Sequence, residues 1–256
     1  MTLGERMKEY EKVSRGYLMK RMPVIVRLDG CHFHTFTRGL NKPYDKTLMK
    51  IMQQTMQYLC ENIQGCVLGY TQSDEITLVL IDYQNLNTSA WFDNQIQKIC
   101  SVAASLATLA FNKCWAKETE NFYEEYWFTE TDEDSDFQRW KLLDMKNYQA
   151  TFDARVFNLS PEEVVNNLIW RQQDATRNSI NLLGQSLYSH NELQSISANQ
   201  LQNKMLIEKN VNWNDELTSF KRGSCCRKDA NGKWYIDNEI PIFTENRAYI
   251  EDLLII

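Results

Sequence analysis

The stretch VIVRLDGCHFHTF, residues 24–36, joins a strand signal directly to chemistry-bearing side chains. Its first residues are apolar and mostly β-branched, which is typical of a buried strand. Asp29 and Gly30 follow at once, with a cysteine and two histidines close behind. This order is compatible with a metal site or with a phosphate-binding turn. To choose between a metal site and a phosphate-binding turn, one must know which segment of the fold lies next to Asp29.

The composition is that of a globular protein with one large domain or two small ones. The 256 residues are 43% hydrophobic and 24% charged, and the net charge of −6 argues against broad, nonspecific binding of nucleic acid. The longest mostly apolar run, residues 99–111, is too short to span a bilayer, and the N-terminus has no apolar signal core. Seven cysteines without a CxxC pair indicate reduced thiols and a cytoplasmic protein without a membrane partner.

The periodicity of apolar residues predicts an α+β protein. The expected elements, in order, are a strand at 23–28, a helix at 46–65 that ends at Gly65, two strands within 66–82, a helix at 91–115 and a strand at 148–159. The acidic run 116–136 between the last two is interpreted as a solvated linker or loop. The order βαββαβ is that of a ferredoxin-like, palm-type antiparallel sheet with helices on one face.

The domain organisation follows from the change in pattern at residue 160. We expect residues 1–159 to form a palm-like domain, with a charged amphipathic helix within residues 1–20. Residues 160–256 are expected to form a helix-rich C-terminal part packed on the palm as one globular unit. Ser160 and Pro161 provide an N-cap and a first-turn proline for the first of these helices.

This topology brings two acidic segments together. The right-handed crossover rule makes the first two strands parallel, so the third runs antiparallel between them. Asp29 and the hairpin turn of Ser73, Asp74 and Glu75 then lie at the same edge of the sheet, although Asp29 and Asp74 are 45 residues apart. Carboxylates that converge in this way repel one another unless a divalent cation such as Mg²⁺ lies between them. Gly30 lets the backbone approach a phosphate, so the sequence predicts a site for metal and triphosphate.

Each of these residues also has a simpler interpretation. A DG pair after a strand is commonly a turn, and an SDE sequence is commonly a hairpin turn. The spacing of Cys31, His32 and His34 is too cramped for the usual structural zinc site. Lys42 is either an ordinary surface lysine or a residue that neutralises triphosphate charge. Arg27 is either an exposed strand residue or a charge partner of the acidic cluster. Arg171 is either a solvated helix residue or a contact to a phosphate.

The motifs resemble those of the tRNA-histidine guanylyltransferase superfamily. RLDGCHFHTF is similar to its RxDGxxFHxF signature, NKPYDK (41–46) to its KPxD element, and GYTQSDEITLVL (69–80) to its YGxSDExSF element. WF at 91–92 followed by Lys98 resembles the next helix, and FDARVFNL and WRQQDA resemble the C-terminal blocks. The resemblance covers most of residues 1–185, with the motifs in the right order.

The resemblance implies a nucleotidyltransferase with a polymerase-type palm that adds nucleotides 3′ to 5′ at tRNA 5′ ends. It implies that Asp29, the Gly30 carbonyl and Asp74 hold two Mg²⁺ ions, with Glu75 as a supporting catalytic carboxylate. ATP, GTP and other nucleoside triphosphates are the implied substrates and a homotetramer is the implied assembly. The implied nucleotide-binding residues are Asp29, Gly30, Cys31, His32, Phe33, His34, Lys42, Asp45, Ser73 and Asp74. The candidate RNA contacts are Arg27, Lys98, Arg171 and Arg177.

One departure from the family pattern bears on the reaction. Guanylyltransferases proper carry HINN shortly after WRQxD, whereas this chain has Thr176, Arg177, Asn178 and Ser179 there. The loss of the histidine resembles the bacterial and archaeal "like" proteins, which repair truncated tRNA 5′ ends in a template-dependent manner. Obligate G addition to tRNA-histidine is the first alternative. A nucleotidyl cyclase and a non-catalytic RNA-binding protein are two others; the QSDE turn differs from the GG(D/E)EF turn of one large cyclase group.

Overall fold

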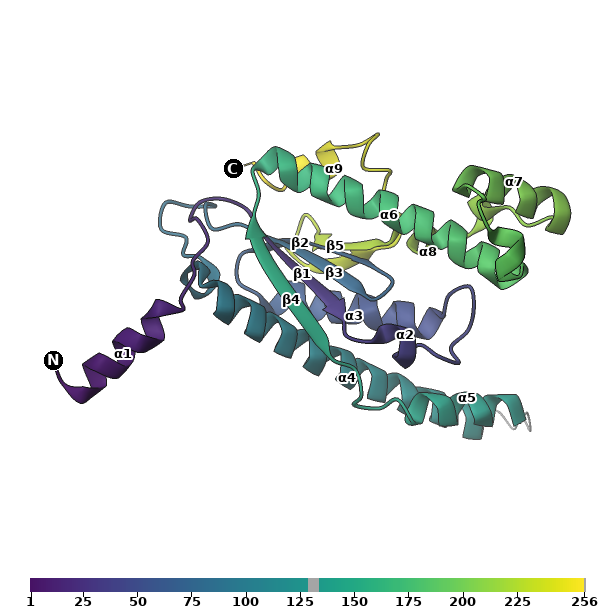
Figure 1. Ribbon diagram of the computed structural model, residues 1–256, viewed down its shortest axis with the longest axis horizontal. Helices are drawn as coiled ribbons and strands as arrows, with labels where there is room; N and C mark the ends of the chain where they lie inside the picture. The colour runs from purple at the N-terminus through teal and green to yellow at the C-terminus, as the bar shows by residue number, and fades with distance from the viewer. Residues whose placement is uncertain (129–133, 256) are drawn as a thin grey trace.

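The fold is built on one six-stranded antiparallel sheet (Figure 1). The computed structural model describes residues 1–128 and 134–255. The strands are β1 (Val24–Gly30), β2 (Cys66–Gln72), β3 (Glu75–Leu80), β4 (Phe152–Asn158), β5 (Ser224–Lys228) and β6 (Trp234–Asp237). Their order is β4-β1-β3-β2-β5-β6, with every neighbouring pair antiparallel. The predicted α+β palm is confirmed, including the placement of β3 between the parallel β1 and β2.

Helices cover both faces of this sheet, not one. The two palm helices, α3 (Lys46–Asn62) and α4 (Ile96–Phe128), share one face, as the βαββαβ order predicts. The C-terminal α6 (Pro161–Leu187) lies across the other face (Figure 1). The C-terminal part also adds β5 and β6 to the sheet, which the sequence analysis does not predict.

Alternation along β1 decides which face each side chain occupies. Val24, Val26 and Leu28 belong to the core beneath α3 and α4, whereas Ile25 packs in the core beneath α6. Because side chains in a strand alternate between faces, Arg27 and Asp29 lie on the α6 side with Ile25. The polar end of β1 is therefore on the face that the C-terminal helix covers.

The acidic segment 116–136 is mainly helical, so its interpretation as a loop is wrong for the residues that the structure describes. Helix α4 continues to Phe128, and α5 (Asp134–Asp144) packs beside it. Residues 129–133 of the predicted loop lie outside the described residues. Thr119 is buried on the face of α4 that packs against the protein, while Glu120 and Glu124 are exposed.

The stretch Ile96–Glu124 of α4 is long and apolar enough, by length and composition, to cross a membrane. In the structure this helix packs on the sheet and buries Ile99, Ala103, Phe111 and Trp115 in the main core. A core helix of a globular protein meets the same criterion, and that is the position it has here.

The remaining helices are short or peripheral. They are α1 (Leu3–Val13), α2 (Phe33–Phe36), α7 (Ala198–Lys209), α8 (Thr218–Arg222) and α9 (Ala248–Glu251), with 3₁₀ turns at Trp91–Asn94, His190–Leu193 and Trp213–Asp215. Helix α1 projects from the body and buries none of its residues (Figure 1). It is nevertheless well capped, because Thr2 and Glu5 form a reciprocal capping box.

Candidate active site

The end of β1 meets the β2–β3 turn. Asp29 is the register partner of Glu75 across β1 and β3, and the Gly30 N–H donates to the Asp74 carbonyl at 3.0 Å. Ser73 has φ 53°, a left-handed conformation that closes the tight turn. The predicted meeting of the two acidic segments is confirmed at the level of the backbone.

Asp29 and Asp74 form a pair of like charges. Burial raises the pKa of Asp74, and the negative charge of Asp29 raises it further. Among the described residues, Asp29 has one cationic side chain within 4 Å: Arg155 Nη2 lies 3.9 Å from its Oδ2, but the Arg155 side chain is 57% exposed. The structure therefore leaves the two carboxylates incompletely neutralised, which favours a cation beside them.

The few oxygen ligands that the protein offers here suit Mg²⁺ better than a metal that is coordinated by protein side chains alone. Within residues 1–128 and 134–255, no three or more Asp, Glu, His or Cys side chains are arranged to hold a metal. Mg²⁺ commonly takes one or two carboxylates, with waters and substrate phosphates as its other ligands. Asp29, Asp74 and the Gly30 carbonyl supply hard oxygens of this kind.

Glu75 does not share this environment. Its carboxylate binds Arg171 through two contacts, of 2.8 and 2.9 Å, and Arg27 Nη2 at 2.5 Å. Burial raises the pKa of Glu75, and the two guanidinium groups oppose that rise. With both oxygens bonded to arginines, Glu75 is an ion-pair partner, and its role as a supporting carboxylate stays a prediction from the resemblance.

The turn after β1 has a packing constraint at Gly30, and its first two amides are already hydrogen-bonded. A Cβ on Gly30 would lie 2.3 Å from Cδ2 of the buried Phe33 ring, so glycine is needed there for close packing. The Gly30 and Cys31 N–H groups already donate to Asp74 and Thr151, so they are not available to a phosphate. His32 and His34 are exposed, with ring centroids 6.3 Å apart.

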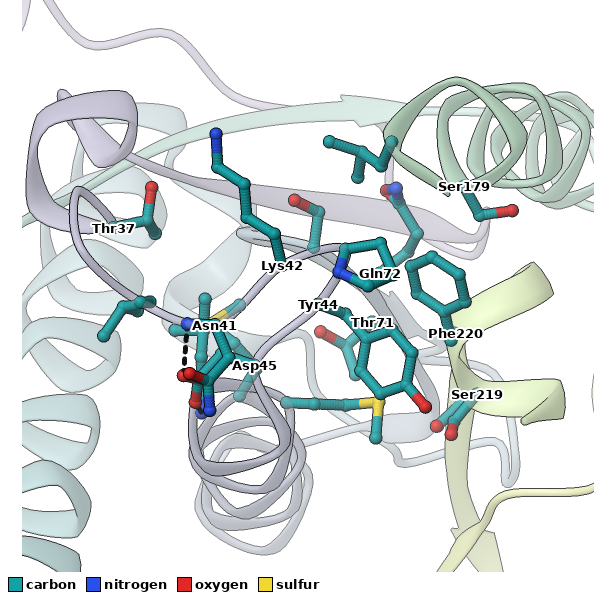
Figure 2. A pocket seen from close by; sticks show the side chains of 18 of the residues that line it. Thr37, Asn41, Lys42, Tyr44, Asp45, Thr71, Gln72, Ser179, Ser219 and Phe220 are labelled. Atoms are coloured by element: carbon teal, nitrogen blue, oxygen red, sulfur yellow. Dashed lines mark hydrogen bonds between the residues drawn. The ribbon is translucent and has the colours of Figure 1, made fainter. Parts of the chain in front are cut away.

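A cavity of 240 Å³ lies beside the hairpin (Figure 2). Loop residues Asn41, Lys42 and Tyr44 form one wall, Thr71 to Ser73 of the hairpin another, and Ser179 and Phe220 from α6 and α8 a third. Lys42 and Ser73 therefore line a common space, as expected for nucleotide contacts. The rings of Tyr44 and Phe220 stack with centroids 4.2 Å apart and form an apolar wall.

Asp45 lines the same cavity, but its carboxylate is fully engaged elsewhere. Oδ1 caps α3 by accepting from Thr47 and Leu48 N–H groups, and Oδ2 accepts from the Asn41 N–H and from Arg139. The Asp45 side chain is 1% exposed. Its hydrogen bonds indicate a structural function, and the nucleotide contact that the resemblance implies stays a prediction.

The candidate RNA contacts fall into different environments. The guanidinium groups of Arg27 and Arg171 are directed at Glu75, which argues against direct contacts with RNA. Lys98 stacks on Phe92 near the start of α4, where the chain pairs with residues 16–18 before β1, far from Asp29. Arg177 is 61% exposed and pairs with Asp174 at 2.6 Å. Of the four, only Arg177 is both exposed and close to the cavity residues of α6.

Sequence reasoning misses Arg155. This residue lies on β4 in the FDARVFNL stretch and is two positions from Asp153, so both side chains share one face of an edge strand. Because β4 pairs with β1, that face is also the face of Asp29. The period of two within the predicted strand 148–159 puts Asp153 and Arg155 on one face, but only the pairing of β4 with β1 in the structure brings that face beside Asp29.

A protein-family model matches the palm part of this chain. The model described as "Thg1: tRNAHis guanylyltransferase" matches residues 4–160, which is more than half of the chain. The chain belongs to the tRNAHis guanylyltransferase family. Membership makes it a nucleotidyltransferase of the tRNAHis guanylyltransferase type, and α6, β5 and β6 lie beyond the matched region.

Two solved structures are similar to this tRNAHis guanylyltransferase family member over the full length of both chains. A bacterial tRNAHis guanylyltransferase (Thg1)-like protein in complex with ATP is 41% identical with a TM-score of 0.85. A bacterial Thg1-like protein in complex with GTP is 37% identical with a TM-score of 0.77. A probable tRNA(His) guanylyltransferase of Homo sapiens is 28% identical over 214 residues, covering 78% of this chain and 63% of the human protein.

Proposed function

We propose that this protein adds nucleotides in the 3′-to-5′ direction to the 5′ ends of truncated tRNAs, with the opposite strand as template. The observation that carries the proposal is the meeting of Asp29 and Asp74 beside the cavity of Lys42 and Ser73. The complexes of similar bacterial proteins with ATP and with GTP support nucleoside triphosphates as substrates.

The reaction has two phosphoryl-transfer steps. A 5′-phosphate oxygen of the tRNA attacks the α-phosphorus of ATP, which releases pyrophosphate and leaves an adenylylated end. The 3′-hydroxyl of an incoming nucleoside triphosphate then attacks the 5′-phosphorus of the tRNA, which releases AMP. Both steps bring several negative charges to one place, so the site must bind phosphate oxygens and offset their charge.

Different residues of this chain would bind the metal ions and the phosphate groups. Asp29, Asp74 and the Gly30 carbonyl would hold two Mg²⁺ ions, which activate an attacking oxygen and stabilise a leaving one when bound. Lys42 offsets triphosphate charge from the cavity side. The backbone amides of His32, Phe33 and His34, in the turn after β1, are the proposed donors to phosphate oxygens.

Template dependence is supported by the residues at 176–179. The HINN histidine is replaced, and Ser179 of this segment lines the cavity. Watson–Crick pairing with the acceptor-stem strand supplies base choice without a dedicated protein contact. Obligate addition of G to tRNA-histidine is the alternative outcome of the test.

The test uses a 5′-phosphorylated tRNA that lacks its first nucleotide, incubated with ATP, Mg²⁺ and each nucleoside triphosphate in turn. We expect restoration by the base complementary to position 72 of the tRNA, and a change of that template base should change the nucleotide added. Addition of G whatever the template would establish the alternative. Formation of a cyclic nucleotide from ATP or GTP without RNA would identify a nucleotidyl cyclase and reject both tRNA reactions. RNA binding without any product would indicate a non-catalytic RNA-binding protein.

The site assignment is tested in the same assay with Asp29→Ala. We expect loss of activity by a factor of about 10² or more, because a metal ligand is removed. Glu61→Gln is a matched control, since Glu61 is an exposed carboxylate on α3 away from the site. Unchanged addition by Asp29→Ala would reject the metal assignment.

We also propose a cytoplasmic homotetramer. All seven cysteines are free thiols, which suits a reducing compartment. Helix α1 exposes Leu3, Tyr10 and Val13, which suits contact with another copy. Light scattering coupled to size exclusion measures the assembly directly, and a monomer at micromolar concentration would reject it.

A further inference from the structure

A buried ion network joins α6 to the catalytic hairpin. Arg171 on α6 bonds Glu75 through Nε and Nη2, and Arg27 on β1 bonds the same carboxylate. The side chains of Arg171, Glu75 and Arg27 are only 8%, 10% and 20% exposed. Arg171 and Glu75 are 96 residues apart in sequence, so their contact exists only because α6 packs across the sheet.

The network is adjacent to both proposed metal ligands. Glu75 follows Asp74 in the chain and is the register partner of Asp29. A rotation of the Glu75 backbone would therefore move the Asp74 side chain and its distance from Asp29. The two-point contact with Arg171 fixes the plane of the Glu75 carboxylate, because a guanidinium fork admits one relative orientation.

Stability alone is a weak reason for this arrangement. The free energy needed to remove two charged groups from water is nearly as large as the electrostatic attraction between them. A buried ion pair is therefore often no more stabilising than apolar residues of the same volume. In contrast, substitution of residues that orient metal ligands commonly lowers metal affinity or activity by 10- to 100-fold. The adjacency of Glu75 to Asp74 in the chain and to Asp29 across the strands favours the second function.

We propose that Arg171 is a positioning residue, which acts through Glu75 to hold Asp74 at the distance from Asp29 that a pair of Mg²⁺ ions requires. Glu75 is the link in this arrangement and not a metal ligand. Arg171 extends the network outward to Asp174 at 3.0 Å, and Asp174 contacts the exposed Arg177. This inference rests on the proposed function, since it assigns the metal site to Asp29 and Asp74.

The test compares Arg171→Lys with wild type. Lysine keeps the positive charge but offers a point charge in place of a fork, so the pairing survives while the orientation is lost. We expect the affinity for Mn²⁺, used as a spectroscopic probe and followed by electron paramagnetic resonance in the presence of ATP, to fall by about 10-fold. We expect kcat for nucleotide addition to fall by about 10- to 100-fold, with the Kd for tRNA within about twofold of wild type.

A double variant tests whether Arg171 acts through Glu75. If it does, Arg171→Lys added to Glu75→Gln lowers Mn²⁺ affinity no further than Glu75→Gln alone. Additive losses would overturn the proposal. Arg247→Lys is the matched control, because Arg247 also pairs with a carboxylate, Glu251, and also bonds α6, at Asn166, but it lies away from the hairpin.

Two other outcomes overturn the proposal in distinct ways. Weaker tRNA binding with a reduced salt dependence and unchanged Mn²⁺ affinity would make Arg171 an RNA phosphate contact. A lower Tm with unchanged Mn²⁺ affinity would make the network purely structural. The Mn²⁺ measurement does not require turnover, so failure of the proposed reaction in wild type is distinguishable from failure of this inference.

Discussion

Asp74 is held in an environment that disfavours its charged form. Burial raises its pKa and Asp29 adds to the rise, so the protonated carboxyl is preferred in the folded state relative to the unfolded chain. A group with a raised folded pKa contributes stability below its ordinary value, and this contribution is lost as the pH rises through the folded value. At neutral pH the ionised Asp74 therefore reduces the stability of the metal-free fold.

Asp74→Asn should consequently stabilise the metal-free protein while it removes activity. We expect the free energy of unfolding at neutral pH to rise by about 1 kcal/mol, which raises Tm by about 2–4 °C in a protein of this size. The gain should shrink as the pH falls toward the ordinary aspartate pKa, where wild-type Asp74 is also neutral. Calorimetry in the presence of a chelator measures this, with Asp153→Asn, a 55% exposed carboxylate on β4, as control. A decrease in Tm for Asp74→Asn would contradict the argument.

The same pKa shift predicts the pH dependence of metal binding. Mg²⁺ needs the ionised carboxylate, so its affinity should begin to fall at a higher pH than an ordinary aspartate would give. Calorimetric titration with Mg²⁺ across the acidic range measures this fall. An affinity that is flat down to the ordinary aspartate pKa would show that Asp74 is not a ligand.

Gly30 is constrained by the Phe33 ring. A Cβ at position 30 would lie 2.3–2.6 Å from three ring carbons, and the ring itself is packed against Phe36, Phe111 and Phe152. Gly30→Ala should therefore lower the free energy of unfolding by about 1–3 kcal/mol. Urea unfolding measures the loss. Gly4→Ala, whose new Cβ would have no neighbouring atom within 4 Å, should stay within about 0.5 kcal/mol of wild type.

At the scale of elements, Asp45 ties the start of α3 to α5. It caps α3 through two amides and pairs with Arg139 of α5, whose side chain is only 16% exposed. Asparagine preserves the cap but not the ion pair, so Asp45→Asn separates the two contributions. The substitution leaves a buried guanidinium without its partner.

We expect Asp45→Asn to cost about 3–5 kcal/mol of unfolding free energy while KM for the nucleotide changes by less than about threefold. Urea unfolding and steady-state kinetics measure the two effects. Ser160→Ala is the control, because Ser160 stands at the N-cap of α6 without a side-chain cap bond. A large rise in KM with intact stability would instead restore the nucleotide contact that the resemblance implies.

At the scale of the whole molecule, the C-terminal part completes the core. Ile25, Leu68, Tyr70 and Val79 of the palm strands are at most 2% exposed because α6 and the segment around Phe243 cover them. A fragment of residues 1–160, the region matched by the family model, would expose this apolar face. We therefore propose that the palm and the C-terminal part form one folding unit.

The fragment should bind a hydrophobic dye and show no cooperative thermal transition, whereas the intact chain should unfold in one step. Deletion of residues 1–13 is the control, because α1 buries none of its residues and the shortened chain should still unfold in one cooperative step. Cooperative unfolding of the fragment, followed by near-ultraviolet circular dichroism, would establish an independent palm domain.

The sequence by itself determined the palm and the pairing of its acidic segments. The apolar, β-branched run of β1, the turn at Ser73 and the handedness of crossovers are local or general rules, so they place Asp29 beside Asp74 without knowledge of the remaining chain.

Only the tertiary structure decided which carboxylates are held in ion pairs and how many strands the sheet has. Glu75 looks like a third catalytic carboxylate in the sequence, but Arg171 reaches it from 96 residues away once α6 packs across the sheet. Asp45 resembles a nucleotide contact until Arg139 and the α3 amides occupy it. The addition of β5 and β6 likewise depends on pairing across more than 150 residues. Contacts between distant segments are set by packing of whole elements, and no local pattern encodes that packing.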